Sequence, residues 1–130
     1  MRAPDYAEPL IGWRVWCVVE TRAGLRLGSV IHDQLWPLGA ELVARCLSDG
    51  DHHAPDEACS CGIHAARDPA AVRSYLRGRD EPGTIGRVLG RVLLWGNVIE
   101  HEGGWRAERA YPLDFVGRQP ANTHRLAAST

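Results

Sequence analysis

Lysine is absent from this chain, because all 15 basic residues are arginine. Its absence removes every candidate for a Schiff-base lysine, a phosphate-loop lysine or an ammonium general base. Long apolar runs are absent as well, since no segment approaches the roughly 18–20 consecutive apolar residues that a membrane-spanning helix needs. The start, MRAPDYAEPL, lacks the basic-then-apolar pattern of a secretory signal. We therefore expect a cytoplasmic protein without a membrane partner.

An excess of charge of one sign is also missing. The 15 basic residues face 16 acidic ones, so a net charge of −1 creates no global field that draws the chain to nucleic acid. Familiar catalytic motifs are missing too, including a phosphate loop, a dinucleotide-binding glycine pattern, a nucleophile elbow and a His-Glu-x-x-His zinc motif. These absences argue against nucleic acid as a partner and leave a protein or a small molecule as the unidentified partner.

The chain does contain enough apolar sequence for one folded domain. Its 130 residues are 45% hydrophobic and include five tryptophans, so a core can form without disulfides. We expect a single domain over residues 10–116. A flexible N-terminus is expected at 1–9 and a flexible C-terminal tail at 117–130, where the sequence has little to bury.

Alternation of apolar and polar residues predicts an antiparallel hairpin over residues 11–31, with a turn at 21–24. The segment 41–47 alternates as well, and we interpret it as a strand, although its length also suits a short helix. A helix is predicted at 69–77, because Asp68 suits the N-cap and Pro69 the first helical position.

The glycine-punctuated run at 85–101 and the return after Gly104 predict a second hairpin. A three-residue loop at 102–104 pairs Ile99 with Ala107, whereas a two-residue loop at 103–104 pairs Ile99 with Glu108, and we favour the apolar pair. The pattern as a whole predicts an α+β fold, a small antiparallel β-barrel or strongly bent sheet with one helix. An all-helical fold is disfavoured by the glycines.

Cysteine and histidine gather in a polar segment that hydrophobic burial alone does not order. Its candidate ligands are Cys46, His52, His53, Cys59, Cys61 and His64. Tetrahedral zinc takes four thiolate or imidazole ligands, so the three cysteines and one loop histidine could close around one ion. The competing interpretation is a buried Cys46 with surface cysteines and solvated histidines. Cys17 alternates with apolar residues and is expected to be a buried small hydrophobe instead.

Two stretches of sequence resemble a family of small uncharacterised bacterial proteins, many of them actinobacterial. The first runs from His52-His53-Ala54-Pro55 to Cys59-Ser60-Cys61-Gly62-Ile63-His64-Ala65; the second is Leu94-Trp95-Gly96-Asn97-Val98-Ile99-Glu100-His101 with Trp105-Arg106-Ala107-Glu108 and Ala110-Tyr111-Pro112. The family pattern, His-x-Ala-Pro, implies His52 over His53, and the family's tyrosine at position 64 weakens His64. The predicted zinc ligands are therefore Cys46, His52, Cys59 and Cys61, and the resemblance implies no reaction class.

The favoured function is a small zinc-binding module, non-enzymatic, that binds or regulates an unknown partner. A thiol-dependent or metal-dependent enzyme at the same loop is the first alternative, with Cys61 and His64 as the thiol pair. The second is a surface for single-stranded nucleic acid, built from Trp95, Trp105, Arg87, Arg91, Arg106 and Arg109. Charged residues at 100–102 could also form an acid/base site, although cross-strand ion pairs explain them more simply.

Overall fold

A computed structural model describes residues 6–31, 34–46 and 52–120 of the chain. The strands are β1 Tyr6–Thr21, β2 Gly24–Ser29, β3 Leu42–Val43, β4 Ile63–Ala66, β5 Thr84–His101 and β6 Gly104–Pro120. Two short 3-10 turns, η1 Pro69–Ala71 and η2 Arg73–Leu76, are the helical elements of these residues. The expected flexible ends lie partly outside the described residues; inside them, 6–9 belong to β1 and 117–120 to β6. No helix in the described part of the chain is long and apolar enough to cross a membrane.

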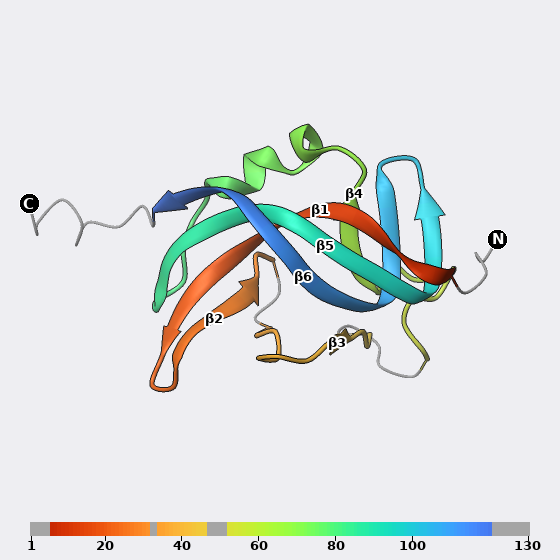
Figure 1. Cartoon of the computed structure of the whole chain (residues 1–130), viewed down its shortest axis with the longest axis horizontal. Coiled ribbons are helices and arrows are strands. Elements are labelled where there is room, and N and C mark those ends of the chain that lie inside the picture. Colours follow the sequence, from red (N-terminus) through yellow and green to blue (C-terminus); the bar gives the residue numbers. More distant parts are fainter. Residues whose placement is uncertain (1–5, 32–33, 47–51, 121–130) are drawn as a thin grey trace, which may run out of the picture.

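Three long strands make up most of the molecule. β5 pairs antiparallel with β1 on one side and with β6 on the other, and Figure 1 shows all three as curved ribbons that cross the molecule. β2 pairs with β1, β3 pairs with β6, and β4 lies between β1 and β6. The sheet is not a closed barrel, and the described residues are nearly all β, so the prediction of an α+β barrel with a helix is wrong.

The predicted helix at 69–77 is replaced by η1 and η2. Its start is as predicted, because the Asp68 side chain accepts a hydrogen bond from the Ala70 amide at 2.9 Å. The next hydrogen bonds connect residues three apart, and no residue of either turn is buried, so little packing energy supports a longer helix. The Tyr75 carbonyl, near the end of this segment, accepts from the buried Arg87 guanidinium at 2.7 Å.

The N-terminal hairpin is as predicted. β1 and β2 pair from Trp16 opposite Ser29 to Thr21 opposite Gly24. Trp16 is fully buried and meets Trp36 edge-on, with ring centroids 5.5 Å apart. This pair anchors the core, whose other buried members are Leu42, Ile63, Ala65, Val92, Leu94, Val98, Ala107 and Ala110.

The predicted register of the second hairpin is wrong. His101 pairs with Gly104, so Ile99 lies opposite Arg106 and Val98 opposite Ala107. A β-bulge between Trp95 and Val98 adds one residue to β5 and restores the apolar pairing on the core side of the bulge. Gly96 has a φ of +81° there, and the freed amide of Asn97 donates to the Glu108 carboxylate at 3.0 Å.

The short strands β3 and β4 lie along one edge of β6. β3 pairs with residues 109–110 and β4 with residues 104–107, while β5 occupies the opposite edge. The Ala44 amide donates to the Glu108 carbonyl, and Ile63 pairs with Ala107. The chain therefore leaves this edge after Ala44 and returns to it at Ile63, one position along β6. We call the intervening segment, residues 45–62, the excursion loop, and we call the place where its two ends lie side by side at this edge its neck.

Candidate metal centre

The neck of the excursion loop holds two of the predicted ligands. Cys46 follows Ala44 by two residues, and Cys61 precedes Ile63 by two residues. Because Ala44 and Ile63 are held at neighbouring positions of β6, the two cysteines are brought to the same place by strand pairing. Cys59 and His52 reach the neck from within the loop. The polar segment between β3 and β4 is thus anchored to β6 at both of its ends.

Four candidate ligand atoms converge at this neck. The sulfurs of Cys46, Cys59 and Cys61 and a ring nitrogen of His52 all lie within 4.8 Å of one another. The Cys46 and Cys59 sulfurs are 3.7 Å apart, and the Cys61 sulfur is 3.4 Å from His52 Nε2. None of the four cysteines, all of which the structure describes, forms a disulfide. The structure therefore brings together the four residues expected from the sequence, and they could hold a metal ion.

The spacing suits a tetrahedral ion. With metal–sulfur bonds of about 2.3 Å, two sulfurs of a tetrahedron lie about 3.8 Å apart. The observed Cys46 to Cys59 separation of 3.7 Å agrees with that edge. Cys46 is buried at 7% exposure, while the other three side chains are partly exposed. The cluster thus has one buried ligand, Cys46, and three partly exposed ligands, through whose side an ion can enter from solvent.

Arg106 of β6 anchors the ligand-bearing loop to the sheet through hydrogen bonds. Its Nη1 donates to the carbonyl oxygens of Asp56 at 3.1 Å and of Cys61 at 2.7 Å, and also to that of Cys59. These carbonyls belong to the ligand-bearing segment, so one side chain fixes the backbone of two ligands. The sequence pattern placed Arg106 in the surface for single-stranded nucleic acid and did not reveal this role.

Gly62 lets the chain turn from the cluster into β4. Its φ is +116°, and a Cβ at this position would lie 2.9 Å from the Pro55 Cβ. Asp56 stabilises the preceding turn, because its side chain accepts from the Ala58 amide at 2.8 Å and its carbonyl from the Cys59 amide at 3.1 Å. The path of the loop is therefore determined by local turn chemistry together with the Arg106 contacts.

The electrostatics of the cluster suit a bound cation. Burial raises the pKa of the Cys61 thiol, and the neighbouring sulfurs of Cys59 and Cys46 raise it further. Three thiolates without a cation repel one another, whereas a divalent cation leaves only one net negative charge. The Arg106 guanidinium lies beside the site and offsets that charge. Cation binding thus stabilises the deprotonated cluster.

Other candidate ligands lie elsewhere. His53 is exposed and does not join the cluster. The His64 ring bonds the Ser60 carbonyl through Nε2 at 2.8 Å, so it is not paired with Cys61. Cys17 is buried in β1 at 8% exposure, as expected for a small hydrophobe.

The arginines of the nucleic-acid alternative are engaged within the chain. Arg87 bonds Asp80, Arg91 bonds Asp114 and Arg109 bonds Glu41. Arg106 is committed to the loop carbonyls. In the acid/base alternative at 100–102, Glu100 is also engaged, because it pairs with Arg67. The four arginines therefore do not present a free set of charges to a nucleic acid.

Comparisons of the chain with protein-family models, with curated proteins and with solved structures give no match. The functional argument therefore depends on the site itself. Its strongest element is the convergence of three sulfurs and one imidazole at the neck of a loop.

Proposed function

We propose that this protein is a small zinc-binding module in which Cys46, His52, Cys59 and Cys61 hold one structural Zn²⁺. The observation that carries the proposal is the convergence of these four ligand atoms within 4.8 Å of one another. A set of three thiolates and one imidazole is typical of structural zinc. Thiolates must stay reduced to bind the ion, so a cytoplasmic setting suits the site.

In the proposed module, the bound ion stabilises the loop between β3 and β4. Residues 45–62 are polar, and Ala54 and Pro55 are among the few loop residues that are buried. Zinc bound across the neck replaces the missing hydrophobic contacts and ties the exit of β3 to the entry of β4. The free energy of metal binding then becomes folding free energy for the loop.

A non-enzymatic role follows from the number of ligands. Catalytic zinc keeps one coordination position for water or substrate, whereas four protein ligands complete a tetrahedron. The cluster offers four, so the metal-dependent enzyme alternative has no open position to use. The thiol alternative is disfavoured because the Cys61 sulfur lies 3.4 Å from His52 Nε2, and both residues belong to the ligand cluster. We therefore favour a binding module whose partner is a protein or a small molecule.

Metal content tests the proposal. Protein purified without added zinc should carry close to one zinc ion per chain by native mass spectrometry. Cys61→Ser should lose the ion and lower the melting temperature, because a ligand and the loop neck are lost together. Cys17→Ala is the matched control, since this cysteine is buried outside the cluster.

The control also defines the contradictory result. If Cys17→Ala strips the metal while Cys61→Ser retains it, the ligand assignment is wrong. A wild-type chain that carries no metal, and whose thermal unfolding is unchanged by added zinc and by chelator, contradicts the proposal as a whole.

A further inference from the structure

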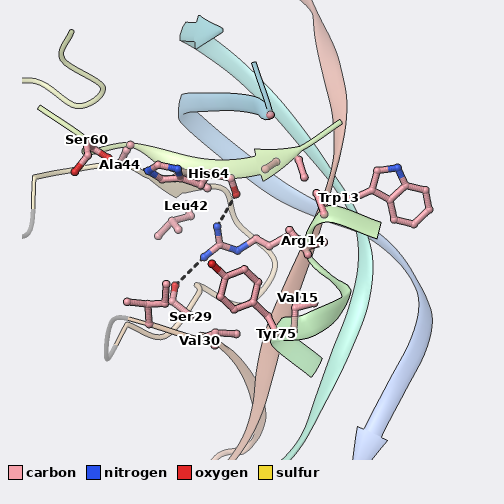
Figure 2. Close-up of a pocket in the computed structure, with 18 of the residues that line it drawn as sticks. Trp13, Arg14, Val15, Ser29, Val30, Leu42, Ala44, Ser60, His64 and Tyr75 are labelled. Atoms are coloured by element: carbon pink, nitrogen blue, oxygen red, sulfur yellow. Dashed lines mark hydrogen bonds between the residues drawn. The ribbon is translucent and has the colours of Figure 1, made fainter. Parts of the chain in front are cut away.

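A pocket of about 530 Å³ lies beside the metal loop and is separate from the ligand cluster. It opens between β1, the end of β2, β4 and η2, and Figure 2 shows the side chains that line it. Its apolar wall includes Trp13, Val15, Val30, Leu42, Ile63 and Val72. Its size lies within the range of roughly 300–1,000 Å³ that is typical of small-molecule sites.

The charges on the pocket wall are of one sign. Its charged side chains are Arg14 and Arg45, the imidazoles of His64 and His101 line it as well, and no Asp or Glu does so among the residues that the structure describes. Burial lowers the pKa of His64, and the charges of Arg14, Arg106 and His101 lower it further. The surroundings of His64 are therefore cationic, without a nearby carboxylate that would offset them.

Arg14 is the central feature of this pocket. Its Nη1 donates to the His64 carbonyl at 2.7 Å and its Nη2 to Ser29 Oγ at 3.2 Å, as Figure 2 shows. Its Nε is buried and has no hydrogen-bond partner. Its guanidinium stacks over the Trp36 ring, with Cζ 5.0 Å from the ring centroid. Within the described residues Arg14 has no carboxylate partner, and burial lowers its pKa to about 10.

Arg87 is a buried arginine of the same fold whose guanidinium has a carboxylate and two carbonyls as partners. Arg87 bonds the Asp80 carboxylate at 2.9 Å and the carbonyls of Tyr75 and Arg79 at 2.7 and 2.9 Å. Asp80 thus neutralises the Arg87 charge, and each of the three guanidinium nitrogens donates a hydrogen bond. Arg14, whose residue is partly exposed, keeps an unused buried donor at Nε and an unbalanced charge, which costs free energy unless a ligand compensates it.

We propose that the Arg14 pocket binds a small monocarboxylic acid with an apolar body. The carboxylate pairs with the Arg14 guanidinium, and the body lies against the apolar wall. Arg45, the other arginine of the wall, is exposed to water, so Arg14 carries the charge that needs a partner. One carboxylate balances it, whereas a phosphate dianion would leave a charge unpaired in an apolar site. The charge of Arg14 therefore selects a carboxylate as the head group of the ligand, and the apolar pocket wall selects an apolar body.

The metal loop contributes part of this pocket. Ser60 and Gly62 line it, and the Ser60 carbonyl is bonded to the His64 ring. Zinc at the loop neck would then support the pocket wall. The inference goes beyond the proposed zinc module and does not depend on it, because Arg14, Ser29 and the apolar wall belong mainly to the sheet.

Octanoate is a suitable probe, with octan-1-ol as its neutral counterpart and inorganic phosphate as a competing anion. Isothermal titration of the full chain should give saturable one-to-one binding of octanoate. Octanol should bind at least about tenfold more weakly, because it lacks the charge that pairs with Arg14. Equal binding of octanoate and octanol, or absence of saturable octanoate binding, overturns the proposal, and so does phosphate binding as tight as that of octanoate.

Variants assign the binding to Arg14. Arg14→Met should weaken octanoate binding by at least about tenfold while binding of octanol stays the same. Arg109→Gln is the matched control, because Arg109 pairs with Glu41 away from the pocket and should leave octanoate binding unchanged. Octanoate binding that survives Arg14→Met overturns the proposal.

If Arg14→Met does not fold, the wild-type chain still decides through the NMR signal of the Arg14 Nε–H, assigned by triple resonance. Octanoate should shift this signal as the donor gains a partner, and octanol should not. A signal that octanoate leaves in place contradicts the proposal. Metal content measured on the same samples separates a failure of the pocket from a failure of the zinc module.

Discussion

The guanidinium of Arg106 donates a 2.7 Å hydrogen bond to the backbone carbonyl of Cys61. It joins a long strand of the sheet to one of the four clustered ligands. The same guanidinium reaches the Cys59 carbonyl, so the sheet positions two sulfurs through one side chain. Outer contacts of this kind orient metal ligands and affect how tightly the metal binds.

Replacing Arg106 should therefore weaken zinc binding without removing a ligand. We expect Arg106→Met to lower zinc affinity by about 10–100-fold, measured by competition with a chromophoric chelator. Arg109→Gln, on the same strand, should leave the affinity unchanged, because Arg109 contacts Glu41 rather than the loop. An unaltered affinity in Arg106→Met would show that the loop positions its ligands unaided.

Two ion pairs of different depth should contribute differently to stability. Asp80 and Arg87 are 5% and 6% exposed, whereas Asp114 and Arg91 are both 39% exposed. Asp80→Asn leaves a buried guanidinium without its counter-charge and should cost about 3–5 kcal/mol of unfolding free energy. Asp114→Asn should cost much less, since water screens the exposed pair. Urea unfolding compares the two, and equal losses would contradict this account.

Cys17 should make stability depend on alkaline pH. Burial raises the pKa of its thiol above the unfolded value of 9.0, so the folded state holds this proton more tightly. Its contribution is complete below pH 9 and is lost as the pH rises through the raised folded pKa. Cys17→Ala should cost about 1 kcal/mol at pH 7, and this difference should shrink above pH 9. A difference from wild type that stays constant between pH 7 and pH 10.5 would disprove the effect.

Close backbone approach at Gly90 should make this position intolerant of a side chain. A Cβ there would lie 2.0 Å from the Asp114 carbonyl oxygen, where β5 meets β6 at a register shift. Gly90→Ala should destabilise the fold by about 1–3 kcal/mol or more. At Gly117 the nearest atom to an added Cβ is 3.9 Å away, so Gly117→Ala should be close to neutral in thermal unfolding. Similar melting temperatures for the two variants would refute the assigned crowding.

Ligand chemistry and local alternation were readable from the sequence. The hairpin of β1 and β2 follows from two-residue periodicity, and the three clustered cysteines follow from ligand type and the polar loop that carries them. The choice of His52 over His53 came from the family resemblance alone. The α-helix at 69–77 was predicted from its start signals alone. Those signals do not reveal that neither turn buries a residue, so the packing that would support a longer helix is missing.

The pairing register of β5 with β6 was the other feature that the sequence did not predict correctly. Ile99 was given an apolar partner across a three-residue loop, but the bulge at Gly96 and Asn97 shifts the pairing so that Val98 meets Ala107 instead. The strand Ile63–Ala66 is short and was missed, since four residues carry little periodic signal. The pocket around Arg14 was also missed, because an arginine in an alternating strand gives no local sign of the residues from other strands that surround it.

X-ray absorption at the zinc edge tests the central claim most directly, because it counts the atoms bound to the metal. The account predicts three sulfurs at about 2.3 Å and one nitrogen at about 2.0–2.1 Å, with no bound water. Cys59→Ser should reduce the sulfur count to two or release the ion, while Cys17→Ala should leave the spectrum unchanged. A wild-type spectrum with fewer than three sulfurs, or with a water oxygen in the fourth position, would contradict a closed structural site at the loop neck.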